Sequence, residues 1–365
     1  MISIRTGCGG RLGQLARDLW HSSSRRKSLS KRRTNVVQAM RIGIWASNPD
    51  VDIIIRRCRA ARVDTVTLDW TAVPGFVETG IVASDKLRGM VHHLMHCGIT
   101  VPAMLGNIGA QVAPGEPRSA ERPAIERALA NIRAMGIVGI PVLINYVHTR
   151  EPEDPAMDEE AWGRLIEALR EYVAVARESK VRLANHGIWK CLDPTLRVSA
   201  IARGFNETNY RSFREPGWIG PFLARTAESM NRLIEAVPDA CNGVCLCTGM
   251  YITGADPARE VLRFRGRIHF VQIRDVSGGR WPYAEEAFPG TGDLNFAEIF
   301  GRLAEVGYDG YAHTEHLGRS HNAGTGGERG FEDPELEPRA VAYARELFRA
   351  AVNRAGGERL PDHPL

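Results

Sequence analysis

Glu315 and His316 stand side by side at the end of a short apolar run that covers residues 308–315. A glutamate carboxylate can hold a hard divalent cation, and a histidine imidazole can take up and release a proton near neutral pH. Removing a proton next to a carbonyl group and expelling a neighbouring hydroxyl requires a cation, a base and an acid. This pair is therefore the first candidate for a catalytic centre.

Three earlier apolar runs also end in residues that can bind a metal or an anion. His186 ends one run, Cys247 ends another, and Gln272 and Arg274 lie at the end of a third. Imidazole and thiolate ligands suit Mn²⁺, Fe²⁺ or Zn²⁺ better than Mg²⁺, whereas the neutral amide of a glutamine is a weak ligand. Together with Glu315, these residues form a candidate metal site.

Each residue also has a structural interpretation that involves no chemistry. A single histidine after a strand often only satisfies hydrogen bonds, and a free cysteine is among the most frequently buried residue types. Cys245 and Cys247 would point to the same side of a strand, so a site with two thiolates stays open. Arg274 could simply pair with Asp275 or Asp309. The catalytic interpretation depends on all of these residues lying at successive strand ends.

Apolar runs alternate with amphipathic segments from residue 40 onward, a pattern typical of βα units. Strands are predicted at 41–46, 63–70, 99–105, 142–147, 181–186, 243–248, 268–275 and 308–315. Helices are predicted at 51–61, 85–97, 122–135, 159–179, 222–236, 257–264, 296–306 and 338–351. Such units predict parallel strands with right-handed crossovers, and eight of them favour a closed (β/α)8 barrel over an open sheet. In a barrel, the ends of the last four strands are consecutive around one rim, where active sites are built.

The distribution of charge divides the chain into a basic leader at 1–39, a barrel domain at 40–355 and a short tail at 356–365. Nine of the 47 lysines and arginines lie in residues 1–40, with one of the 43 acidic residues. The rest of the chain is slightly acidic and gives no support to nucleic-acid binding. We interpret the leader as a disordered tail or as the product of an early translation start, with a transit peptide or a nucleic-acid arm as the alternatives.

The apolar runs and the cysteines indicate where the protein works. No run approaches the roughly 18 residues of a membrane span, so no membrane contact is expected. The seven cysteines lack the spacing of a disulfide framework, which favours a reducing cytoplasm. The oligomeric state stays open, and a homo-oligomer is one outcome because barrels of this kind often associate.

At its candidate site the chain resembles the D-mannonate dehydratases, which belong to the wider superfamily of xylose-isomerase-like barrels. The segments that carry the resemblance are Asn242-Gly-Val-Cys-Leu-Cys-Thr-Gly249, Arg267-Ile-His-Phe-Val-Gln-Ile-Arg274, Gly292-Asp293, Glu315-His316, Trp45-Ala-Ser-Asn-Pro49 and Asn145-Tyr146. The resemblance covers the chain from Arg41 to about Ala351 and is most specific in the segment that ends in Cys-Thr-Gly.

The resemblance implies a metal-dependent hydro-lyase that removes water from a sugar acid to give a 2-keto-3-deoxy acid. It implies a divalent metal, Mn²⁺ before Fe²⁺ or Zn²⁺, held by His186 and Cys247. Glu315 stands where the family has an aspartate ligand, and Gln272 stands where it has a histidine ligand. Losing that imidazole weakens the binding of a transition metal.

The resemblance also implies roles for residues that do not bind the metal. Arg274 would bind the substrate carboxylate through its forked donors and assist catalysis. His316 matches the catalytic histidine and would act as general acid and base, while Asn145 and Trp45 would bind substrate. Phe331 stands where the family has a tyrosine, so this chain lacks that phenol.

Two other functions stay open at this point. One is a sugar isomerase or epimerase of the same superfamily, in which two carboxylates serve as ligand and base. It would be favoured by a second carboxylate near Glu315, such as Asp69 or Asp275. The other is a catalytically silent barrel that binds a sugar or a protein partner, because Gln272 and Phe331 both weaken the expected site.

Overall fold

The computed structural model describes residues 40–106, 117–147, 157–187, 223–224, 227–249, 256–277, 285–317 and 335–356. The predicted leader, residues 357–365 of the tail and Phe331 lie outside these ranges. None of the helices within them combines the length and the apolar character that a membrane crossing requires. The five cysteines in the described ranges are all free thiols.

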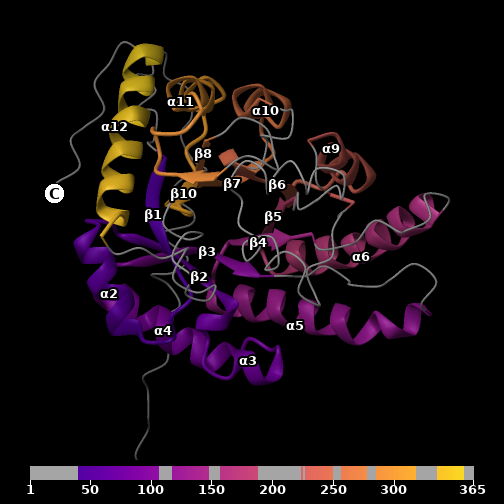
Figure 1. Ribbon diagram of the computed structural model, residues 1–365. Helices are drawn as coiled ribbons and strands as arrows, with labels where there is room; N and C mark the ends of the chain where they lie inside the picture. The colour runs from indigo at the N-terminus through magenta and orange to yellow at the C-terminus, as the bar shows by residue number, and fades with distance from the viewer. Residues whose placement is uncertain are drawn as a thin grey trace, which may run out of the picture. The chain divides into compact units, whose positions relative to one another are not determined.

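Eight parallel strands close into a barrel, as the alternating pattern predicts. Around the barrel their order is β1-β10-β7-β6-β5-β4-β3-β2 (Figure 1). The strands are β1 Arg41–Ala46, β2 Thr65–Asp69, β3 Thr100–Gly106, β4 Val142–Tyr146, β5 Arg182–His186, β6 Asn242–Cys247, β7 Ile268–Ile273 and β10 Tyr311–Thr314. The strands β5, β6, β7 and β10 are therefore consecutive neighbours, and their carboxyl ends share one rim of the barrel.

Helices surround the outside of the barrel (Figure 1). They are α2 Val51–Ala60, α3 Phe76–Thr79, α4 Ser84–His96, α5 Arg122–Val138, α6 Asp158–Glu178, α9 Ala227–Ala236, α10 Pro257–Arg263, α11 Phe296–Glu305 and α12 Glu337–Gly356. Two 3-10 turns, η1 Trp70–Ala72 and η2 Arg118–Ala120, complete the helical elements of the described ranges. The helix α4 contacts α5, α5 contacts α6, and α10, α11 and α12 contact one another in sequence, as in a ring.

Three of these helices begin at a residue whose side chain caps the helix. The carboxylates of Asp50 and Asp256 and the amide oxygen of Asn295 accept hydrogen bonds from backbone N–H groups in the first turns of α2, α10 and α11. Capping satisfies donors that have no partner within the helix. The sequence marks these starts, and the three capped helices begin at the predicted residues.

The strands are buried on both faces, as expected for a parallel sheet covered by helices. Their inner faces form a small cluster inside the barrel, made of Ala103, Val142, Ile144, Ala184, Cys245 and Phe270. Their outer faces join the helices in the main core. Successive side chains of each strand therefore alternate between the barrel interior and the helical layer.

The strand β7 is shorter than predicted, and a second small sheet follows it. The strand β7 ends at Ile273, and Asp275–Ser277 (β8) pairs antiparallel with Glu285–Ala287 (β9) as a separate two-stranded sheet. The buried carboxylate of Asp275 accepts backbone N–H groups of Val276 at 2.8 Å, Gly290 at 2.8 Å, Gly292 at 2.9 Å and Leu294 at 3.4 Å. One side chain thus holds the start of β8 and the segment 290–294 that leads into α11.

Candidate metal centre and active site

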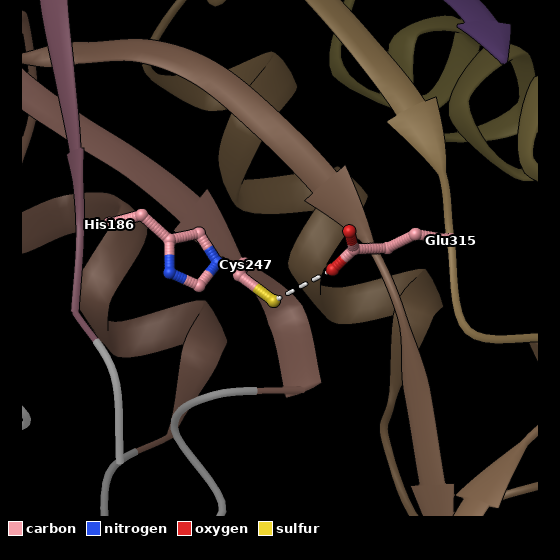
Figure 2. A group of neighbouring side chains, drawn as sticks. All are labelled: His186, Cys247 and Glu315. Atoms are coloured by element: carbon pink, nitrogen blue, oxygen red, sulfur yellow. Dashed lines mark hydrogen bonds between the residues drawn. The ribbon is translucent and has the colours of Figure 1, made fainter. Parts of the chain in front are cut away.

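Three of the four predicted ligands come together at the rim of the barrel. One ligand atom each of His186, Cys247 and Glu315 lies within 4.8 Å of the others, and all three residues are buried. They come from the ends of β5, β6 and β10, and their side chains point toward a common point (Figure 2). The Sγ atom of Cys247 lies 3.5 Å from Oε1 of Glu315. A nitrogen, a sulfur and an oxygen donor within this distance can hold one transition-metal ion.

His186 presents one ring nitrogen to the cluster and uses the other for orientation. Its Nδ1 lies 2.7 Å from the carbonyl oxygen of Gly187, which can only accept, so Nδ1 carries the proton and donates. Nε2 is buried and has no hydrogen-bond partner among the described residues. Burial lowers the pKa of His186 to about 4, so the ring is neutral and its Nε2 lone pair is available to a metal.

Cys247 and Glu315 share one proton and one negative charge. Burial raises the pKa of the Cys247 thiol, and the neighbouring Glu315 carboxylate raises it further. Burial also raises the pKa of Glu315, but His316, His313 and Arg274 outweigh it and lower the value to about 2. The thiol therefore keeps its proton and donates toward an ionised carboxylate. A divalent cation would displace that proton, because a metal binds the thiolate.

Gln272 lies beside this cluster on β7. Strand pairing places it in register with Cys247 on one side and with His313 on the other. Its amide is fully buried beside His186 and Tyr146, close enough to shift their pKa values, but neither amide atom reaches hydrogen-bond geometry within the described residues. A polar group buried in this way is costly unless something else satisfies it. The place of the Gln272 amide in a metal site as a fourth, weaker donor stays a prediction.

The Cys-Thr-Gly segment after β6 has a separate task for each of its residues. Cys247 belongs to the ligand cluster. The Thr248 hydroxyl donates to the carbonyl of Arg274 at 2.5 Å and accepts the backbone N–H of Arg274 at 2.9 Å, which fixes the end of β7. Gly249 lies against the aliphatic stem of Arg274, where a side chain would collide with it. The segment therefore positions Arg274 as well as supplying a ligand.

The guanidinium of Arg274 and the imidazole of His316 are both placed to act at the cluster. The charge of Arg274 lowers the pKa of Cys247 and of Glu315. Nε2 of His316 lies 4.0 Å from Oε1 of Glu315. In an extended strand these two neighbours would point to opposite faces. His316 instead has φ 50°, a left-handed conformation, and its ring reaches the same site as the carboxylate.

The structure does not bring Asn145 to this cluster. Its amide donates to Asn185 at 2.9 Å, and Asn185 donates to Asn242 at 2.7 Å, which in turn donates to backbone carbonyls of Leu233 and Val237 at the outer layer. This row of amides joins the outer faces of β4, β5 and β6. Trp45 is different, because its neighbours Ile44 and Ala46 pack in the outer core and the alternation turns its ring to the inner face.

Tyr146 reaches the cluster in place of its neighbour Asn145. Its ring centroid lies 4.3 Å from that of His186. Burial raises the pKa of Tyr146, and the charge of Glu315 raises it further, so the phenol is protonated. The sequence places Tyr146 two residues after Ile144, and the structure adds the direction by placing Ile144 in the inner cluster.

No second carboxylate joins Glu315 within the described ranges. Asp275 is occupied by four backbone N–H groups, and Asp69 accepts the backbone N–H and the hydroxyl of Thr71 at 2.8 Å and 2.7 Å. The ligand group contains one carboxylate, one thiol and one imidazole. This set differs from the two carboxylates that the isomerase hypothesis requires.

Comparisons with known proteins give one family and several similar chains. The profile of the family described as xylose isomerase-like TIM barrel matches residues 55–347. A mannonate dehydratase of Enterococcus faecalis is 28% identical over 171 residues, which are 44% of this chain and 45% of that protein. The chain thus matches less than half the length of this relative.

Two solved structures have a similar fold. The crystal structure of mannonate dehydratase from Streptococcus suis serotype 2 aligns with a TM-score of 0.65 at 17% identity, covering 88% of this chain and 97% of that one. A structure of L-ribulose 3-epimerase aligns with a TM-score of 0.63 at 18% identity, covering 87% and 97%. At these identities the similarity extends to the fold alone.

Proposed function

The chain belongs to the xylose isomerase-like TIM barrel family, and on that premise we propose that it is a metal-dependent hydro-lyase acting on a sugar acid. The reaction removes the proton from the carbon next to the carboxylate and the hydroxyl from the following carbon, so that one water leaves. The resulting enol tautomerises to a 2-keto-3-deoxy acid. The partial similarity to mannonate dehydratases supports a mannonate-like substrate.

One observation carries the proposal, namely the convergence of His186, Cys247 and Glu315 at the ends of neighbouring strands. Nitrogen, sulfur and carboxylate donors fit Mn²⁺, Fe²⁺ or Zn²⁺, and we place Mn²⁺ first. The buried amide of Gln272 is the fourth donor, directly or through a water. A cation held there would polarise the substrate oxygens and stabilise negative charge next to the carboxylate.

The remaining residues would bind the substrate and move its protons. Arg274 would bind the carboxylate of the sugar acid with two parallel hydrogen bonds, and Trp45 would line the mouth of the site. His316 would transfer the proton as general base and acid, because its ring lies beside the cluster. The ring of Tyr146 packs against His186, and its phenol would donate a hydrogen bond to a substrate hydroxyl.

The experiment that tests this function measures metal and product together. Protein purified without chelator is analysed for Mn, Fe and Zn, and then assayed with a panel of sugar acids for 2-keto-3-deoxy products. We expect about one metal ion per chain in the parent protein and none in His186→Ala or Cys247→Ala. In His316→Ala we expect activity to fall by about 100-fold or more, which is the size of the effect of general acid–base catalysis. Cys241→Ala is the control, because this thiol lies before the start of β6, at the end opposite Cys247, and donates to the carbonyl of Val173.

Other outcomes would favour the other hypotheses. Epimerised sugars in place of keto-deoxy acids would indicate the isomerase or epimerase activity. A protein with no metal at millimolar Mn²⁺ would indicate a silent barrel. Full activity of His316→Ala on the substrate would contradict the proposed mechanism.

A further inference from the structure

His313 is a buried histidine for which the proposed reaction has no task. It lies on β10, two residues before Glu315, and its side chain is completely inaccessible to solvent. Neither of its ring nitrogens has a hydrogen-bond partner among the described residues. Leaving a buried polar group without a partner costs about 1–3 kcal/mol, so an imidazole that only filled space here would destabilise the protein relative to an apolar side chain. Its ring packs against Phe270, with the ring centroids 5.1 Å apart.

The two oxygens of the Glu315 carboxylate face different neighbours. Oε1 lies 3.5 Å from the Cys247 thiol, on the side of the ligand cluster. Oε2 lies 3.6 Å from Nε2 of His313. The ligand atoms of His186, Cys247 and Glu315 form a compact group to which His313 does not belong. His313 is therefore placed behind the carboxylate, and not among the ligands.

We propose that His313 is a positioning residue, whose Nε2–H donates a hydrogen bond to Oε2 of Glu315 and so keeps Oε1 as the oxygen that binds the cation. The inference rests on the proposed metal site. The present separation lies just beyond hydrogen-bond length, and a shift of about 0.5 Å, which is within ordinary thermal displacement, closes it. The contact would keep the carboxylate from turning both oxygens to the metal.

The position of Gln272 explains why this chain needs such support. Strand pairing places His313 directly beside Gln272, so the two side chains occupy the same level of the barrel on neighbouring strands. An amide at that level is a weak ligand. With fewer strong ligands, the affinity for the metal depends more on the exact orientation of His186, Cys247 and Glu315. Residues that orient a ligand through a hydrogen bond typically change metal affinity by about 10–100-fold.

The test compares metal binding by the full chain and three variants. Mn²⁺ affinity is measured by calorimetry, and the visible absorption of the Co²⁺-loaded protein reports the number and geometry of its ligands. His313→Leu removes the donor, and His313→Gln replaces Nε2–H by an amide N–H at a similar distance from the backbone. His269→Leu is the matched control, because it removes a buried histidine of β7 that precedes the inward-facing Phe270 and therefore points to the helical layer.

We expect His313→Leu to bind Mn²⁺ about 10–100-fold more weakly and to change the Co²⁺ spectrum, as Glu315 becomes bidentate. His313→Gln should stay within a few-fold of the parent protein with the parent spectrum, and His269→Leu should match the parent in both. Parent-like affinity and spectrum in His313→Leu would overturn the inference, as would equal losses in His313→Leu and His269→Leu.

Two further outcomes need separate treatment, namely a variant that does not fold and a parent protein that binds no metal. If His313→Leu does not fold, His313→Asn replaces it, because its shorter amide mimics Nδ1 and not Nε2. Equal binding by His313→Asn and His313→Gln would then overturn the inference, and weaker binding by His313→Asn alone would support it. A parent protein that binds neither Mn²⁺ nor Co²⁺ would overturn the metal site itself.

Discussion

The β-carbon that Gly249 lacks would lie 2.8 Å from both Cγ and Cδ of Arg274. Such a contact is too short, so Gly249→Ala should push the guanidinium away from the substrate carboxylate. A hydrogen bond to a charged group contributes about 1.5–3 kcal/mol, and we expect kcat/KM for the sugar acid to fall by about 10–100-fold. Steady-state kinetics of the variant measures this loss.

The control for that prediction is an alanine at a glycine with free space. Gly163 in α6 has no atom within 4 Å of the place where its β-carbon would lie. Gly163→Ala should keep the parent kinetics and raise stability slightly, because alanine is a better helix former. Parent-like kinetics in Gly249→Ala would mean that Arg274 does not bind the substrate.

Asp275→Asn should destabilise the protein by removing part of a buried acceptor. Both oxygens of Asp275 accept backbone N–H groups, and an asparagine would turn an NH₂ group toward two of these donors. Each unsatisfied buried donor costs about 1–3 kcal/mol, so we expect a loss of about 2–4 kcal/mol in the free energy of unfolding. Urea denaturation gives the value.

Asp256→Asn is the matched change at a helix cap. Asp256 needs one oxygen, which accepts the backbone N–H of Ala258 at 2.9 Å, and asparagine caps helices as well as aspartate does. We expect nearly unchanged stability. Similar losses in both variants would show that the amides around Asp275 are not responsible.

The sequence predicts the barrel and the convergence of three candidate ligands, because both depend on period and order alone. Eight alternating units leave few topologies, and parallel strands end at the same rim, so His186, Cys247 and Glu315 must lie near one another. The ends of the elements follow local signals such as the caps at Asp50 and Asp256. These features need no knowledge of contacts between distant residues.

The inward face of each strand is harder to predict from the sequence. Both faces of β4 are buried, so an apolar run does not say which residues line the barrel. The candidate there was Asn145, whereas the ring of Tyr146 is the one beside His186. A shift of one residue exchanges the two faces, and only the position of Ile144 in the inner cluster fixes the choice.

Other features depend on contacts between residues far apart in the chain. The partnership of His313 with Glu315, the hold of Asp275 on the connection to α11, and the left-handed backbone of His316 have no local pattern in the sequence. The short helix α3 and the β8–β9 pair were likewise not predicted, because elements this short carry too few residues to show a period.

Arg57→Ala should cost about 3–5 kcal/mol of stability, which is typical of removing one partner of a buried ion pair. Nε of Arg57 donates to Oε2 of Glu337 at 3.1 Å, while its Nη2 contacts Oε1 of Glu337 and also donates to the carbonyl of Trp45 at 2.8 Å. Both charged side chains are buried, so the variant leaves the Glu337 charge in the interior without the Arg57 charge that faces it.

The double variant Arg57→Leu/Glu337→Leu should recover most of that loss, because it removes both charges from the interior. Arg302→Ala is the surface control, since its pair with Glu305 is solvent-exposed and should contribute little. Thermal or urea unfolding of the variants gives the comparison. A double variant as unstable as Arg57→Ala would mean that packing, and not the stranded charge, dominates the cost.

Residues 40–355 should carry the whole activity, since every candidate site residue lies on barrel elements or directly after them. A chain that begins at Met40 should therefore keep the metal content and kcat/KM of the full chain. Elemental analysis and steady-state kinetics of the two proteins make the comparison. Loss of metal or activity on removing residues 1–39 would give the leader a role in the site.

His269 should make the protein less stable as the pH falls below neutrality. Burial lowers the pKa of His269 to about 4, with Arg182 and Arg267 acting in the same direction, from an ordinary value of 6.5. The unfolded chain therefore takes up a proton as the pH falls through about 6.5, whereas the folded protein does so only near 4. Stability is fully present above the unfolded pKa, and this one group removes about 2 kcal/mol between pH 7 and pH 5.

The variant His269→Gln isolates this contribution, because its amide stays polar and does not titrate. The site is tight, since a β-carbon on Gly243 would lie 2.4 Å from the His269 ring, so a polar side chain that fits the same space is the appropriate replacement. Urea unfolding of the parent and the variant at pH 7 and pH 5 should show the smaller drop in the variant. Other groups, His186 among them, titrate equally in both proteins and cancel in the difference. Equal drops in the two proteins would mean that the folded state accepts a proton on His269 without penalty.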